Sequence, residues 1–211
     1  NKAIGVNYTH NNSDDLKVLK ANKEIILCAG AINTPKILQL SGIGPASLLS
    51  EKGIEVINDL KGVGNNLRDH YGVRMVSYLQ NIKTFNSIVR GPPLLYEIFK
   101  WIIQKPSVLS VSPSLVHVFT KSSLKLKIPD LEYVMSPASF KEGTVGLLDK
   151  VSGMTLGVWQ TRPKSNGYVK INSKNIHEPP IINPNYLSDP YDVDVLLKSI
   201  RIGRNFLSTS P

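Results

Sequence analysis

The first part of the chain alternates hydrophobic and polar stretches that predict short strands and helices. Residues 2–9 alternate well enough for a strand, and residues 16–20 form a second one after a polar turn. Residues 25–28 are uninterruptedly apolar, which is typical of a buried strand in a parallel or central position of a sheet. We therefore expect part of an α/β unit here.

Proline and glycine then delimit two short helices. Pro35 suits the first position of a helix, and Pro45 opens a second helix that Gly53 closes. Residues 54–56 alternate as a strand, and residues 61–69 are predicted to be a loop.

The character of the pattern changes at about residue 71. Five strand-like stretches separated by turn residues predict an antiparallel sheet: residues 71–79, 115–120, 131–136, 154–161 and 168–173. Helices open at Pro92 and Pro190. The fold class expected is α+β (mixed α/β), divided into residues 1–70 and 71–211.

The helix that opens at Pro92 has an unusual distribution of side chains. Glu97, Lys100 and Gln104 form a narrow polar stripe, and apolar residues cover the rest. A helix on a membrane surface and a core helix both fit this pattern. The stripe is thin and weakly basic, which favours the core helix.

Composition and charge narrow the possible functions. Apolar residues make up 41% and charged residues 19%, as in an ordinary globular protein. The single cysteine, Cys28, excludes an intramolecular disulfide and a cysteine-based zinc cluster. The net charge of +9 raises nucleic acid as a partner, but the lysines are scattered and only Phe119 lies near the densest cluster, residues 121–127. We expect a solvated basic surface, no nucleic-acid partner and no transmembrane segment.

The residues alone do not assemble an active site. None of the four histidines lies at metal-ligand spacing from another, and no metal site is expected. His117 interrupts an apolar strand and shares a face with Leu115 and Phe119, so it is either a core histidine or a pocket-lining one. There is no Gly-x-Ser-x-Gly, and no glycine-rich dinucleotide fingerprint is complete.

One long motif carries more information. Residues 30–44, GAINTPKILQLSGIG, resemble the second signature of the glucose–methanol–choline (GMC) flavoprotein oxidoreductases. Residues 62–70 resemble the family's Gly-x-Asn-Leu-x-Asp-His loop, and residues 163–169 its Pro-x-Ser-Arg-Gly turn, with Asn166 in place of the arginine. The likeness extends over essentially the whole chain.

This resemblance implies part of an FAD-binding domain in residues 1–70, followed by a substrate domain that combines an antiparallel sheet with flanking helices. It implies FAD as cofactor, a small-molecule alcohol as substrate, and hydride transfer from the alcohol to the flavin; the electron acceptor stays open. The family's FAD fingerprint and catalytic histidine have no counterpart in these 211 residues. We therefore expect an internal fragment that is inactive alone, and assign no catalytic residue.

The resemblance also suggests binding residues. The family places the turn Cys28, Ala29, Gly30 and Ala31 near the nucleotide part of the flavin, although a plain tight turn before a helix fits equally. In choline-oxidising relatives a glutamate stands where this chain has Leu115. Leu115 and His117 are accordingly the candidate substrate residues, and the alcohol is expected to be neutral and apolar. The alternative is a stand-alone basic binding module, or an inactive remnant that kept the fold without catalysis.

Overall fold

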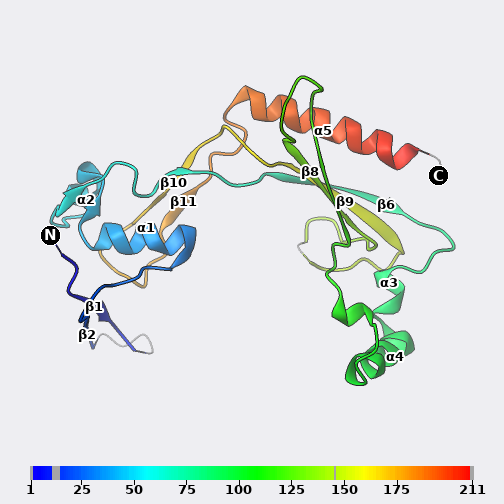
Figure 1. The fold of residues 1–211 in the computed structure, drawn as a ribbon, viewed down its shortest axis with the longest axis horizontal. Coiled ribbons are helices and arrows are strands. Elements are labelled where there is room, and N and C mark those ends of the chain that lie inside the picture. Colours follow the sequence, from blue (N-terminus) through cyan, green and yellow to red (C-terminus); the bar gives the residue numbers. More distant parts are fainter. Residues whose placement is uncertain (1, 11–14, 145, 210–211) are drawn as a thin grey trace. The chain divides into compact units, whose positions relative to one another are not determined.

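The computed structural model describes residues 2–10, 15–144 and 146–209, which form two compact units (Figure 1). The first unit contains the residues up to Asp69 together with Ser165–Tyr186, and the second contains His70–Lys164 together with the residues from Leu187 onward. The combination of helices with antiparallel sheets confirms the expected fold class. The division expected from the sequence, at residue 70, assigns residues 165–186 to the second part. In the structure these residues belong to the first unit, because strand β10 (Gly167–Lys170) within them pairs with β5 (Asn65–Leu67).

The first unit combines short strands with two helices. Its sheets are an antiparallel hairpin, a parallel pair, and a three-stranded sheet in the order β11-β10-β5. Its elements are β1 (Gly5–Tyr8), β2 (Lys17–Lys20), α1 (Gly30–Leu40), β3 (Ile43–Gly44), α2 (Ala46–Glu51), β4 (Asn58–Asp59), β5 (Asn65–Leu67), β10 (Gly167–Lys170) and β11 (Ile181–Asn183).

A buried amide ties helix α1 to strand β10. The side chain of Gln39 is fully buried; its Nε2 donates to the carbonyls of Val63 (3.2 Å) and Val169 (3.0 Å), and its Oε1 accepts from the backbone N–H of Ile171 at 2.9 Å. Gly64 lies against this amide with φ of 77°, and a Cβ there would collide with the Val169 carbonyl and the Gln39 side chain. The long motif therefore has a packing role.

Several local expectations for the first unit are wrong. Residues 25–28 form no strand and Cys28 is exposed, because no described strand lies beside them to supply ladder hydrogen bonds. Helix α1 begins at Gly30, whose φ of 76° suits glycine, so Pro35 lies inside the helix. Residues 54–56 are not a strand, and the loop 61–69 contains β5, which pairs with β10.

The second unit is built on an antiparallel sheet in the order β6-β9-β8-β7, which contains four of the five expected strands. The fifth, expected at residues 168–173, forms β10 in the first unit because it pairs there with β5 and β11. The elements of the second unit are β6 (Gly72–Tyr78), α3 (Phe85–Ile88), α4 (Gly91–Ile102), the 3-10 turn η1 (Val108–Ser110), β7 (Val116–Thr120), β8 (Leu131–Ser136), β9 (Gly153–Gln160) and α5 (Pro190–Ser208). One face of the sheet packs against α5 around a core of Leu131, Tyr133, Leu156, Val158 and Val195. Alternation along the strands leaves the opposite face for other contacts.

Helix α4 is oriented against expectation. Glu97 from the polar stripe is only 7% exposed, whereas the apolar Leu95 is 68% exposed, so the core-helix interpretation is wrong. The physical reason is that Glu97 has hydrogen-bond donors inside the unit, described below. Within residues 2–10, 15–144 and 146–209, no helix has both the length and the apolarity needed to cross a membrane.

Candidate functional site

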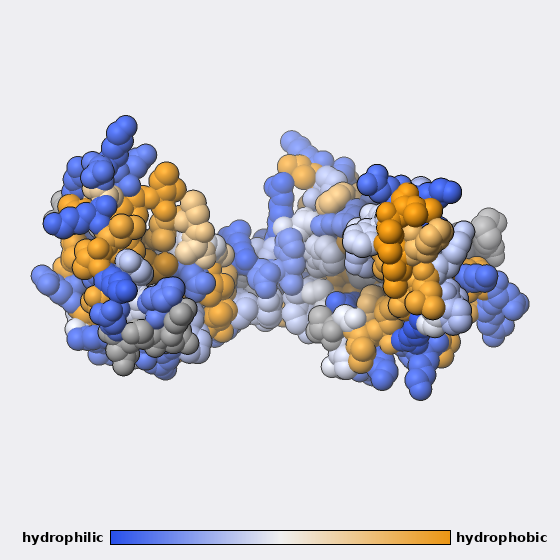
Figure 2. Space-filling model, turned by 90° about the horizontal axis from the view of Figure 1, so that it is seen from below, coloured by the Kyte–Doolittle hydropathy of each residue, from blue (hydrophilic) through white to orange (hydrophobic). Residues whose placement is uncertain are grey.

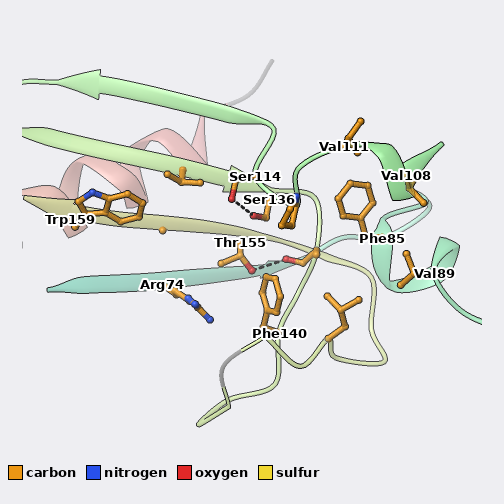
Figure 3. Close-up of a pocket in the computed structure, with 16 residues that line it drawn as sticks. Arg74, Phe85, Val89, Val108, Val111, Ser114, Ser136, Phe140, Thr155 and Trp159 are labelled. Atoms are coloured by element: carbon orange, nitrogen blue, oxygen red, sulfur yellow. Dashed lines mark hydrogen bonds between the residues drawn. The ribbon is translucent and has the colours of Figure 1, made fainter. Parts of the chain in front are cut away.

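The sheet face opposite α5 carries a cavity of about 630 Å³ (Figure 3). The register places Ser136 beside Thr155 and Val134 beside Gly157, and all four line the cavity floor. The walls come from the segments around α3 and η1 and from the loop between β8 and β9; they include Phe85, Val89, Val108, Val111, Phe140 and Leu148. The cavity is therefore mostly apolar, as small-molecule sites usually are.

Few polar groups face this cavity. Thr155 donates from Oγ1 to the carbonyl of Ala138 at 2.6 Å, so its hydroxyl proton is already engaged. The guanidinium of Arg74 lies over the ring of Phe140, 5.5 Å from its centroid. Among the described residues that line the cavity there is no carboxylate. The described part of the lining consequently offers no anionic partner for a quaternary ammonium.

A carboxylate outside the lining fixes one wall. Trp159 lines the cavity and donates from Nε1 to Oε2 of Glu132 at 3.1 Å, and Oε1 of Glu132 lies 2.9 Å from Nδ1 of His117. The ring of His70 stacks on the Trp159 indole, with the two ring centroids 6.3 Å apart. Sequence reasoning missed Glu132; the signal was that it is the one charged residue of strand β8.

The two predicted substrate residues lie on this same sheet face but do not line the cavity. His117 pairs in register with Val134, which is part of the floor, and Leu115 lies just before β7. Leu115 is 52% exposed and the His117 side chain 48% exposed, which rules out the core alternative for His117. Their contact with a substrate stays a prediction.

The predicted cofactor residues lie at the start of α1 in the first unit. Cys28, Gly30 and Ala31 are exposed and Ala29 is half-buried. No side chain caps this helix start, and the space where a Gly30 Cβ would stand is open. An uncapped helix start presents backbone N–H groups, and small side chains let a nucleotide approach them closely. The residues present therefore fit part of a nucleotide cofactor.

A second cavity adjoins this turn. It measures about 360 Å³, and Ala31 lines it together with Asn65, Asn66 and Arg68 from the loop around β5. Arg68 donates from Nε to Oδ1 of Asn166 at 2.7 Å. Asn166, which stands where the family's turn has an arginine, therefore forms a hydrogen bond with the loop around β5. Two motifs distant in the sequence thus meet beside the predicted cofactor turn.

Comparison with known proteins gives a consistent result. Models of the N- and C-terminal parts of a family described as GMC oxidoreductase match residues 1–72 and 163–211. The alcohol dehydrogenase [acceptor] of Pseudomonas putida is 35% identical over 212 residues, covering 96% of this chain and 37% of that protein. An oxygen-dependent choline dehydrogenase of Pseudomonas savastanoi is 32% identical, covering 98% of this chain and 36% of that protein.

Solved structures agree on the fold. Formate oxidase of Aspergillus oryzae, studied for its FAD modification, superposes with a TM-score of 0.87 at 24% identity, covering 97% of this chain and 40% of that one. A pyridoxine 4-oxidase superposes with a TM-score of 0.77 at 21% identity, covering 100% of this chain and 37% of that one. The chain thus spans well under half the length of the relatives it matches.

Proposed function

We propose a function from one premise: this chain belongs to the GMC oxidoreductase family. On that basis we propose that it is part of an FAD-dependent enzyme that oxidises a small neutral alcohol. In this proposal the turn at residues 28–31 holds part of the FAD nucleotide, and the cavity of the second unit receives the alcohol. FAD supplies the hydride acceptor when it is bound.

The observation that carries the substrate class is the chemistry of the 630 Å³ cavity. Its lining is mostly apolar, its described lining residues include no carboxylate, and the nearby carboxylate of Glu132 already contacts two donors. Leu115 at the position of the choline-specific glutamate agrees with this interpretation. An apolar alcohol gains from burial here, whereas a quaternary ammonium would lose hydration without an ion pair.

The residues of this chain supply positioning in the proposed reaction. The apolar walls exclude water from the alcohol, and Trp159, fixed by Glu132, bounds one end of the cavity (Figure 3). The base that removes the hydroxyl proton is not assigned to any residue of this chain. We therefore expect the isolated 211 residues to be colourless and inactive.

The test is expression of the complete reading frame that contains this chain. We expect a yellow protein that reduces an artificial electron acceptor with primary aliphatic alcohols and shows little activity with choline. A folded, colourless protein that binds a nucleic-acid probe in a salt-dependent manner would instead support the basic binding module. Activity with choline alone would refute the neutral-alcohol assignment while leaving the family unchanged.

A cavity-filling variant tests the site itself. A Cβ on Gly157 would meet only ordinary van der Waals contacts, with the nearest atoms 3.6 Å away, so Gly157→Leu fills the cavity from its floor at little cost to folding. We expect KM for the alcohol to rise about tenfold or more, as lost apolar contacts imply. Asn22→Leu, at an exposed bend after β2, introduces the same side chain far along the sequence from the cavity residues and should leave KM unchanged.

A further inference from the structure

The orientation of helix α4 is fixed by a buried acid. The carboxylate of Glu97 accepts hydrogen bonds from Oγ of Ser107 and from the backbone N–H of Val108, each at 2.9 Å, and forms an ion pair with Lys100 at 2.5 Å. The hydrogen bond from Lys100 and that from the Val108 N–H lower the pKa of Glu97. These hydrogen bonds favour this rotation of the helix, because turning the carboxylate outward would leave the part-buried N–H of Val108 without its acceptor.

This rotation turns a large apolar face outward. Leu95, Phe99 and Ile102 recur at helical spacing and are 68%, 55% and 65% exposed. Tyr96 and Ile103 continue the same face and are 63% and 41% exposed. Figure 2 shows hydrophobic side chains gathered over α4 on the second unit. A contiguous exposed apolar surface of this kind marks an interaction site.

Most of the charged side chains in and beside this helix are cationic. Residues 80–111 contain four cationic side chains, Lys83, Arg90, Lys100 and Lys105, and a single acid, the buried Glu97. Arg90 is the N-cap residue of α4 and Lys105 lies just beyond its C-terminal end; both are exposed. Positive charge therefore lies at both ends of the helix; the guanidinium of Arg90 also donates to the carbonyl of Leu148 at 2.8 Å.

We propose that α4 docks on an anionic lipid surface, with its apolar face among the acyl chains and its flanking cations at the headgroups. Charge complementarity selects this occupant, because basic side chains near an apolar face strengthen binding to anionic bilayers. The exposed Tyr96 of this face agrees, since tyrosine favours the membrane–water boundary. A second copy of this chain would place the same positive charges opposite one another.

Vesicle co-sedimentation of the complete protein that contains this chain tests the proposal. We expect binding to vesicles of phosphatidylcholine and phosphatidylglycerol that is on the order of tenfold or more stronger than to phosphatidylcholine alone, and that weakens with salt. The double variant Leu95→Ser, Phe99→Ser removes exposed side chains, so it should fold normally and lose most of the binding. Leu124→Ser is the matched control, since Leu124 is 99% exposed and lies outside α4.

Two outcomes overturn the proposal. One is a folded protein that does not sediment with anionic vesicles, which would mean that another part of the protein covers the face. The other is self-association without vesicles that the double variant abolishes, which would assign the face to a second copy. Vesicle binding is measured without substrate turnover, so its failure is distinguishable from failure of the proposed alcohol oxidation.

Discussion

Replacing Gln39 with methionine tests the account of the long motif as a packing device. Gln39→Met keeps the length of the side chain and removes its three hydrogen bonds, to Val63 in the loop, to Val169 in β10 and to Ile171 just after β10. Val169 and Ile171 are 2% and 1% exposed, so the Val169 carbonyl and the Ile171 N–H lose this partner where water does not reach them. Each unsatisfied buried group costs about 1–3 kcal/mol, so we expect a loss of about 4 kcal/mol.

Urea unfolding of the complete protein followed by far-UV circular dichroism gives the loss in free energy, and hydrogen exchange locates it. We expect exchange to accelerate in β10 and in the loop around Gly64, while the sheet of the second unit keeps its protection. Gln80→Met is the control because Gln80 is exposed. A loss below about 1 kcal/mol would refute the reasoning, because it would mean that water or a rearranged backbone satisfies both groups.

Gly64→Ala places a Cβ against the Val169 carbonyl at φ of 77°, and thermal unfolding should show a loss of at least about 2 kcal/mol. Burial, with a smaller effect of Asp130, raises the pKa of Tyr133 to about 12 from 10.0. The neutral phenol therefore contributes its full stabilisation below pH 10. About 3 kcal/mol of the free energy of unfolding is lost as the pH rises from 10 through 12. The Tyr133→Phe variant should not show this loss in an alkaline titration. Glu132→Leu frees the Trp159 indole and should raise KM for the alcohol about fivefold, whereas Glu132→Gln keeps an acceptor for Trp159 and should change KM less than about twofold.

The strands of the second unit's sheet could be predicted because the pattern of apolar and polar residues that specifies each strand lies within that strand. One face of the sheet packs against α5 through alternate residues of β8 and β9, such as Leu131 and Tyr133, and Leu156 and Val158. The same alternation placed His117 on one face with Leu115 and Phe119, but it did not say whether that face packs against the core or lies open. The cavity on that face could not be predicted, because its walls come from α3 and η1, whose positions depend on tertiary contacts.

The wrong predictions share one cause: the contacts that decide the structure come from residues outside the segment concerned. Residues 25–28 have the composition of a buried strand, yet a strand also needs partners for its backbone groups, and no described strand provides them. Helix α4 has the composition of a core helix, yet its rotation depends on Ser107 and Val108, which follow the helix in a separate turn. Hydrophobic periodicity identifies the faces of a helix but does not say which face is buried when the polar one has hydrogen-bond partners.

The cavity and the apolar helix face are products of one segment. Phe85 and Val89 line the cavity just before α4 begins, and Val108 and Val111 line it just after α4 ends. The hydrogen bonds of Glu97 to Ser107 and Val108 therefore do two things at once: they turn the apolar side of α4 outward and they hold the cavity wall that follows it. An alcohol apolar enough to prefer this cavity also partitions into lipid, so a protein that rests on a bilayer through α4 would meet its substrate at increased concentration beside that wall.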